Sequence, residues 1–349
     1  MNRTALLGLG LTAVLLAAAC GRDTTSAGGS AAPLVGVDFP RSDTDFWNSY
    51  IRYVPQYGGE LGVNLKTTNS QNDVATLISN VQTFISQGVK SVVIAPQDTA
   101  AIAPTLDQLA GKKIPVVTID TRPDTGQVFM VVRADNRAYG TKACQLLGTK
   151  LNGKGKVVML QGGLDSINGR DRTEAFHECM KKDFPAITVF GEATDWKSDV
   201  AASKLQTRLA SDPDVRGIYM ESSFALSGTL QILKQKNLLV PPSDPKHVFI
   251  VSNDGIPEEL KNIRDGLIDA TVSQPADLFA EYGLFYAKAA IDGKTFQPGP
   301  TDHGSTIIQV REGLLEDQLA APLVTADGAT IGGENTLKPD DKSLWGNNS

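Results

Sequence analysis

The feature that most constrains the fold is a repeated alternation of short apolar segments with longer amphipathic ones, which begins at Leu34. Short apolar segments such as 91–96 (SVVIAP) and 115–120 (PVVTID) predict strands that are buried on both faces. The segment 73–88, directly before the first of these strands, carries apolar residues at three- and four-residue spacing, which predicts an amphipathic helix. Strands that alternate with helices in this way predict βαβ units, and therefore an α/β fold with parallel sheets.

The same alternation starts again after about residue 134, with further strands expected at 156–162, 187–193, 215–222 and 247–254. A short strand is expected at the segment LIDATVSQ, and a last one at 305–310. Two successive α/β halves of similar size therefore share the chain, and its length suits two domains of ordinary size.

The N-terminus is typical of an export signal. Arg3 precedes the apolar run 5–19, which is short for a membrane span but suits a signal peptide over residues 1–19. The stretch LAAAC resembles a bacterial lipobox, which implies cleavage before Cys20 and a lipid on its sulfur. An ordinary secretory signal with an incidental cysteine is the alternative. Residues 20–33 are rich in Gly, Ser, Thr and Ala, which predicts a flexible tether between the membrane anchor and the folded body.

The net charge restricts the class of binding partner, and the cysteine content indicates a disulfide. The net charge is −6 with no basic cluster, which argues against a nucleic-acid partner. Besides Cys20 the chain has only Cys144 and Cys179, and two thiols in an exported protein are expected to form a disulfide. The alternative is a pair of buried thiols that pack as small apolar residues.

Catalytic and metal motifs are absent from the sequence. The three histidines show no ligand spacing, and no Gly-x-Ser-x-Gly, P-loop or His-Glu-x-x-His motif occurs. We therefore expect neither an enzyme nor a cofactor or metal site.

Polar residues end nearly every predicted strand. In open parallel sheets, ligands bind at the carboxyl ends of the strands. The residues at these ends are Asp38, Gln97, Asp98, Asp120, Gln161, Glu192, Glu221, Ser222, Asn253, Asp254, Ser273 and Gln274. Carboxylates and amides, with arginine and aromatic rings, can satisfy the hydroxyls of a sugar and pack on its apolar faces. The expected ligand is therefore a neutral polyhydroxylated molecule.

The chain from about residue 34 to 315 resembles periplasmic sugar-binding proteins of the ribose-binding type, which serve ABC importers and share their fold with LacI-type repressor effector domains. The matching stretches follow one another along the whole chain: DTDFW, VVIAPQDTAAI, IPVVTIDTR, ADNRAYG, LQGGLDSINGRDRTEAF, ATDW, NDGIPEEL and ATVSQPADLFAEYG.

The resemblance implies the periplasmic binding protein type I fold: two Rossmann-like lobes with parallel sheets that are joined by a three-stranded hinge. The expected N-terminal lobe comprises 34–134 and 275–303, the C-terminal lobe comprises 135–274 and 304–330, and 331–349 is a tail. Crossovers are expected near residues 134–136, near or just after 253–254, at 274–275 and near 303–304. Whether the tail docks is left open, and only Trp345 suggests that it does.

The resemblance also assigns roles to single residues. Phe46 and Trp47 match the aromatic pair that stacks on one face of a sugar ring, and Trp196 matches the aromatic residue of the opposite lobe. For each of these, core packing is the alternative. Asp120 and Asp254 match carboxylates that accept from ligand hydroxyls, with a cap or turn role as the alternative.

Arg172 matches the arginine that donates to the sugar, although Arg170 competes for this role and an exposed position at a helix start is the alternative. Gln274 matches the hinge amide, and Ser222 stands where an amide is expected. Further candidates for ligand contact are Asp43, Asp98, Thr121, Asn168, Arg170 and Asn253. Ala95, Thr121 and Asn253 depart from the ribose type, which favours a different pentose, a hexose, a polyol or an inositol over ribose.

The predicted function is capture of such a ligand by a monomeric lipoprotein, followed by delivery to an ABC transporter permease; the membrane is contacted only through the lipid. The alternative is a binding protein that passes its closed form to a signalling receptor. A transcriptional repressor is rejected, because a signal and tether occupy the place of a helix-turn-helix.

Overall fold

The computed structural model describes residues 31–348. The predicted signal peptide, Cys20 and most of the tether lie outside the described residues. Within residues 31–348, no helix has both the length and the apolar character that a membrane crossing requires.

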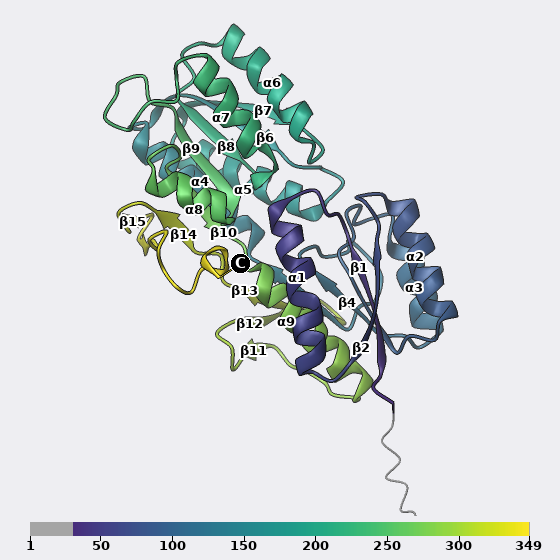
Figure 1. Cartoon of the computed structure of the whole chain (residues 1–349). Helices are drawn as coiled ribbons and strands as arrows, with labels where there is room; N and C mark the ends of the chain where they lie inside the picture. Colours follow the sequence, from purple (N-terminus) through teal and green to yellow (C-terminus); the bar gives the residue numbers. More distant parts are fainter. Residues whose placement is uncertain (1–30, 349) are drawn as a thin grey trace, which may run out of the picture. The chain divides into compact units, whose positions relative to one another are not determined.

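The first lobe is built on an eight-stranded sheet with the order β11-β12-β13-β5-β4-β3-β1-β2. Its strands are β1 (Leu34–Phe39), β2 (Asn64–Asn69), β3 (Ser91–Ile94), β4 (Val116–Ile119), β5 (Met130–Ala134), β11 (Gly299–Pro300), β12 (Thr306–Arg311) and β13 (Leu314–Leu319). Its helices are α1 (Asp45–Glu60), α2 (Val74–Ser86), α3 (Ala103–Gly111) and α9 (Ala276–Ile291). Helices α1 and α9 lie together on one side of the sheet, and α2 and α3 lie on the other (Figure 1).

Strand burial explains this arrangement. All four residues of β3 are buried, and Val93 belongs to the apolar cluster that contains residues of α1 and α9. Its neighbours Val92 and Ile94 belong to the cluster that contains residues of α2 and α3. Successive side chains of a strand point to opposite faces, so a continuous apolar strand requires helices on both sides.

The second lobe is built on a six-stranded sheet with the order β14-β10-β9-β8-β6-β7. Its strands are β6 (Lys154–Gln161), β7 (Ala186–Ala193), β8 (Gly217–Met220), β9 (Phe249–Asp254), β10 (Ala270–Ser273) and β14 (Leu323–Thr325). Its helices are α4 (Asn136–Lys150), α5 (Ile167–Asp183), α6 (Ser198–Ser211), α7 (Leu226–Gln235) and α8 (Pro257–Arg264), with the 3-10 turn η1 (Ser223–Ala225). The predicted α/β fold with two lobes is confirmed.

Three connections pass between the two sheets: from β5 to α4, from β10 to α9, and from β13 to β14. The first two lie at the predicted residues 134–136 and 274–275. The third lies at residues 320–322, so its predicted position at 303–304 is wrong. No crossover occurs at 253–254, because β9 and β10 are parallel neighbours in one sheet.

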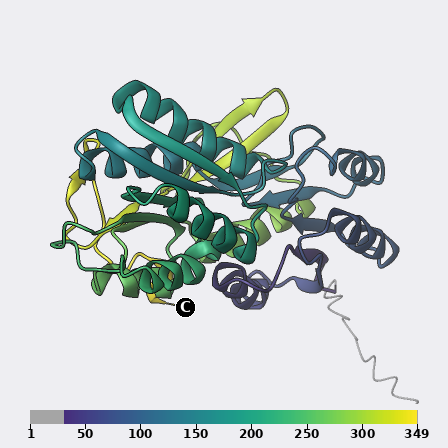
Figure 2. The ribbon, with the colours of Figure 1, turned by 90° about the horizontal axis from the view of Figure 1, so that it is seen from above.

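The lobe boundary expected at residue 304 must be corrected for the same reason. Residues 306–319 form a hairpin in the first sheet, in which β13 pairs in parallel with β5. Figure 2 shows this pair of strands in yellow-green. The strand β13 was missed in the sequence because Glu316 and Asp317 interrupt its apolar pattern. Both carboxylates are buried, and each has a partner: Glu316 accepts from Arg122 and Asp317 accepts from Tyr286.

The predicted disulfide is confirmed. Cys144 of α4 and Cys179 of α5 are bonded, with their Cα atoms 6.2 Å apart.

The C-terminal residues fold onto the protein, which answers the question that the sequence left open. They include the short pair β15 (Thr330–Ile331) and β16 (Glu334–Asn335) and the 3-10 turn η2 (Trp345–Asn347). Leu344 and Trp345 are both buried.

Candidate functional site

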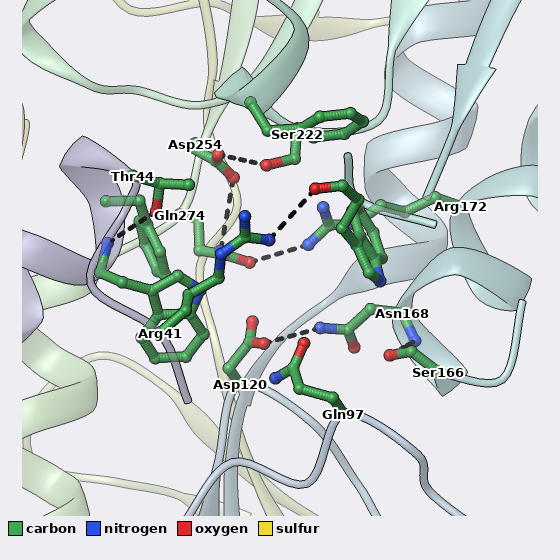
Figure 3. A pocket seen from close by; sticks show the side chains of 14 residues that line it. Arg41, Thr44, Gln97, Asp120, Ser166, Asn168, Arg172, Ser222, Asp254 and Gln274 are labelled. Carbon is green, nitrogen blue, oxygen red and sulfur yellow. Dashed lines mark hydrogen bonds between the residues drawn. The ribbon is translucent and has the colours of Figure 1, made fainter. Parts of the chain in front are cut away.

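A cavity lies between the two lobes, with an empty volume of about 450 Å³ including its mouth. Its wall contains all eight residues that were predicted to bind the ligand: Phe46, Trp47, Asp120, Arg172, Trp196, Ser222, Asp254 and Gln274. Of the further candidates, Asn168 also lines it. The structure thus brings together residues that are up to 228 positions apart in the sequence (Figure 3).

Aromatic rings enclose the cavity from both lobes. Phe46 and Trp47 stand at the start of α1, where Thr44 caps the helix by accepting a hydrogen bond from the Trp47 amide at 3.4 Å. Trp196 follows β7 in the second lobe and contacts Phe224 edge-on, with ring centroids 5.9 Å apart. The rings of α1 and of Trp196 thus approach from different lobes, as stacking on two sides of a ligand requires.

Two glycines provide the space for Trp196. A Cβ atom on Gly162 would lie 2.0 Å from the indole ring, and one on Gly163 would lie 2.8 Å from its Nε1 atom. Any larger side chain at Gly162 would therefore displace the ring. The indole Nε1 is buried and has no hydrogen-bond partner within residues 31–348.

Asp120 follows β4 and supplies an unpartnered acceptor. Its Oδ2 accepts from Asn168 Nδ2 at 3.0 Å, whereas its Oδ1 is buried without a partner in the described part of the chain. Burial raises the pKa of this carboxyl to about 6, although the charges of Arg172 and Arg133 favour its ionised form. A buried acceptor without a partner is costly, so this oxygen is suited to a ligand hydroxyl.

Arg172, on α5, is buried and held on three sides. Its Nε donates to Asn136 Oδ1 at 2.6 Å, and its Nη2 donates to Gln274 Oε1 at 2.9 Å. Its Nη1 donates to the carbonyl of Glu221. The guanidinium also lies over the Tyr139 ring at 4.7 Å from the centroid. Such a network fixes the direction of the guanidinium before any ligand arrives.

Asp254 ends β9, and its carboxylate faces the cavity beside Ser222. Its Oδ2 accepts from Ser222 Oγ at 2.6 Å, from the Ser223 amide at 2.9 Å and from Ser223 Oγ at 2.7 Å. Its Oδ1 has a longer contact, 3.4 Å, with Gln274 Nε2. Burial raises the pKa of Asp254, while Arg172 and the serine hydrogen bonds lower it.

Three residues of the cavity wall have strained backbone conformations. Asp120, Trp196 and Asp254 have φ angles of 61°, 58° and 115°. A positive φ costs a non-glycine residue of the order of 1 kcal/mol or more and persists only where the surroundings fix it. Three such residues at one cavity support a functional role for it.

The other five candidates lie outside the cavity wall. Asp43 pairs with Arg41 and is exposed, and Asp98 accepts from the backbone amides of residues 100 and 101. Thr121 is buried behind the wall. Arg170 bonds Asp124 at 2.5 Å.

Asn253 points away from the cavity, because alternate residues of a strand face opposite sides. Its amide donates to the Tyr219 hydroxyl and to the carbonyl of Glu221, each at 3.0 Å. Of the two competing arginines of α5, Arg172 lines the cavity and Arg170 does not.

Sequence reasoning missed five residues of the wall: Arg41, Thr44, Gln97, Ser166 and Phe224. Arg41 extends into the cavity in Figure 3, and its Nη1 donates to the Trp196 carbonyl of the other lobe at 3.2 Å. Its position in the polar loop after β1 was the only available sign. Gln97 ends a predicted strand, but its position alone does not assign it a role.

Hydrogen bonds between the lobes surround the cavity. Arg133 of β5 donates to Asn168 at 2.8 Å and to Asp171 at 2.7 Å, and the Thr99 amide donates to the Asp165 carbonyl at 3.2 Å. With Arg41 and Asn168, these contacts describe a closed arrangement of the two lobes.

Comparison with known proteins identifies the family. The sequence profile described as "periplasmic binding protein domain" matches residues 35–295. This chain belongs to the periplasmic binding protein family. The sugar- and polyol-binding members of this family are transport proteins that work outside the cytoplasm with ABC transporters, and they are not enzymes.

Individual relatives agree with this result. The chain is 27% identical over 296 residues to the xylitol-binding protein of Mycolicibacterium smegmatis, covering 84% of this chain and 80% of the relative. It is 26% identical to the ribose import binding protein RbsB of Salmonella typhimurium, covering 82% and 94%. A crystal structure of a galactofuranose-binding protein superposes with a TM-score of 0.73 at 22% identity, covering 84% and 95%. The resemblance to the ribose-binding type is confirmed.

The buried carboxyls predict how stability depends on pH. Burial raises the pKa of Asp120 to about 6, of Glu221 to about 7 and of Glu259 to about 8. Between about pH 4 and pH 8 the native state therefore holds more protons on these groups than the unfolded state does. The free energy of unfolding should fall as the pH rises through this window.

Urea unfolding of the ligand-free protein at pH 5, 6.5 and 8 measures this dependence. Asp120→Asn should remove the part of the slope that lies between about pH 4 and pH 6. A midpoint that rises steadily from pH 5 to pH 8 would contradict the prediction.

Proposed function

We propose that this protein captures one neutral sugar or polyol in the interlobe cavity and delivers it to an ABC importer. The observation that carries the proposal is the buried, unpartnered acceptor Asp120 Oδ1, because Asp120 is a residue of the cavity wall. A ligand hydroxyl can donate to this oxygen, and its own oxygen can still accept from a neighbouring donor.

The charges of the wall favour a neutral ligand. Its charged side chains are two arginines, Arg41 and Arg172, and two aspartates, Asp120 and Asp254. The arginines already donate to protein acceptors, so a charged ligand would add an unbalanced charge to a buried site. Hydroxyl groups can join these hydrogen bonds without changing the net charge.

The aromatic rings of the cavity wall, Phe46, Trp47 and Trp196, favour a single small ring or chain. Rings from both lobes would cover the C–H faces of the ligand, and the polar side chains would surround its edge. A pentitol, pentose, hexose or inositol fits this description, and one relative is named for xylitol.

Capture would proceed by closure of the lobes. The ligand would bind to one lobe of the open form, and bending at the three connections would bring Arg172, Trp196 and Asp254 over it. The closed form would then present surface from both lobes to the permease.

A thermal-shift screen over pentoses, hexoses, polyols and inositols tests the ligand class, with calorimetry on each hit. At 100 times its dissociation constant, a ligand should stabilise the protein by about 2.7 kcal/mol. Amino acids and divalent metal ions serve as the contrasting set. If they raise the midpoint and no neutral polyol does, the proposal fails.

We also propose that the protein is held at the outer face of the cell membrane by a lipid on Cys20. The support is the lipobox-like stretch before this residue and the tether after it. Mass measurement of the protein extracted from membranes tests this, because diacylglycerol on Cys20 adds the mass of two acyl chains. An unmodified chain that begins elsewhere would contradict the anchor.

A further inference from the structure

The C-terminal strap, defined as residues 338–348, contributes no residue to the cavity wall. It lies beyond the residues 35–295 that match the family profile. Two contacts fasten it to α8: Arg264 donates to the Pro339 carbonyl and to Asp340, each at 3.1 Å. Its own turn is closed by Asn347, which donates to the carbonyls of Pro339 and Asp341.

The strap places Trp345 directly behind the candidate site. This side chain is only 2% exposed. Its Nε1 donates to the backbone carbonyl of Asp254 at 3.1 Å. Its ring meets Phe46 edge-on, with centroids 5.9 Å apart. Asp254 belongs to the second lobe and Phe46 to the first, so one indole contacts a cavity residue of each lobe.

The hydrogen bond to Asp254 acts on a strained backbone. Asp254 has a φ of 115°. Its backbone carbonyl accepts from the backbone N–H of Gln274 at 3.0 Å as well as from Trp345 Nε1. These two donors fix the peptide plane that follows Asp254. The orientation of the peptide determines where the carboxylate points, because Cα and Cβ move with the backbone.

The strap also approaches the backbone very closely at the next residue. A Cβ atom on Gly346 would lie 2.2 Å from the Gly255 carbonyl oxygen. Glycine is therefore required at 346 for Trp345 to reach its place. A larger side chain here should lift the strap while leaving the tryptophan in the chain.

We propose that Trp345 is a positioning residue for the ligand site, which sets the direction of the Asp254 carboxylate and the tilt of the Phe46 ring. This inference rests on the proposed function, since both residues act on the ligand there. Trp345 does not touch the ligand. Trp345 determines which pattern of ligand hydroxyls Asp254 and Phe46 together accept. Loss of Trp345 should therefore alter the selectivity between ligands as well as the affinity.

Three variants separate the contributions of the indole. Trp345→Phe keeps a ring against Phe46 and removes only the donor to Asp254. Trp345→Ala removes both, and Gly346→Ala keeps the tryptophan but displaces it. Leu106→Ala is the matched control. Leu106 is fully buried in the separate apolar cluster of the first lobe, so its substitution should lower the stability of the protein without affecting the site.

Calorimetry with xylitol and with D-ribose as probes measures the effect on binding. Loss of one hydrogen bond should weaken binding about fivefold in Trp345→Phe. Trp345→Ala and Gly346→Ala should weaken it by about tenfold or more and change the ratio of the two dissociation constants. Leu106→Ala should leave this ratio as in the wild type.

Hydrogen exchange in the ligand-free protein provides a test that does not depend on binding. The Ser223 amide donates to the Asp254 carboxylate and the Gln274 amide donates to its carbonyl. Both should exchange faster in the Trp345 variants and not in Leu106→Ala, compared at equal stability.

The outcomes are distinct. If no sugar or polyol binds the wild type, the proposed function fails, while the exchange rates still decide the role of Trp345. If the variants leave exchange, affinity and selectivity unchanged, the inference is overturned. It is equally overturned if affinity falls alike for all ligands and in Leu106→Ala, since the strap would then contribute only to stability.

Discussion

Arg172→Ala should abolish ligand binding and destabilise the protein. Arg172 is the buried cation that the carboxylates of Asp120 and Asp254 face, and its charge lowers the pKa of both. Without it, the two carboxyls would remain in a buried site with less compensation. Removal of one partner from a buried charged network costs about 3–5 kcal/mol, and the donor that fixes Gln274 at 2.9 Å would also be lost.

Arg172→Lys is the matched control for charge. Lysine restores the positive charge but lacks the planar fork that reaches Asn136, Gln274 and the Glu221 carbonyl together. We expect it to recover most of the stability and little of the affinity. Urea unfolding measures the first and calorimetry with the screened ligand measures the second. Wild-type affinity in Arg172→Ala would remove this residue from the site.

Part of the cavity wall could be predicted because several of its residues follow a rule of topology. Carboxyl ends of parallel strands meet at one edge of a sheet, so Ser222 after β8 and Asp254 at the end of β9 had to lie near one another in the second lobe. Asp120 follows β4 of the other sheet and comes near them only because the two lobes meet at the cavity. The family resemblance then selected among them. Arg41 and Phe224 could not be found in this way, since each lies in a loop or short turn whose path depends on the packing of the whole lobe.

Residues 306–319 were placed in the wrong lobe for a different physical reason. Apolar periodicity predicts a strand only where burial is apolar, and β13 buries two carboxylates that are satisfied by side chains distant in sequence. Asp317 accepts hydrogen bonds from Tyr286 and His303. The sequence pattern around Asp317 does not indicate either partner. The same limit applies to Trp345: the residue was noticeable, but its target, the Asp254 carbonyl, was not.

Removal of the disulfide should lower stability while leaving the ligand site in place. Cys144 and Cys179 are 35 positions apart and join α4 to α5. Cross-linking a loop of this length stabilises a protein by about 2–4 kcal/mol, mainly by restricting the unfolded chain. We therefore expect the double variant Cys144→Ala/Cys179→Ala to unfold at lower urea and with a somewhat steeper slope, because the unfolded chain without the cross-link exposes more surface.

Binding should persist because the two helices are also held together near the cavity by contacts that contain no cysteine. Arg172 of α5 bonds Asn136 of α4 at 2.6 Å, and the helices approach so closely that a Cβ on Gly140 would lie 2.3 Å from the Arg172 carbonyl oxygen. Calorimetry should show an affinity within about twofold of the wild type, since neither sulfur lines the cavity. The wild type in reductant controls for the substitutions. A large loss of affinity at full folding would instead show that the disulfide helps to hold Arg172 in register.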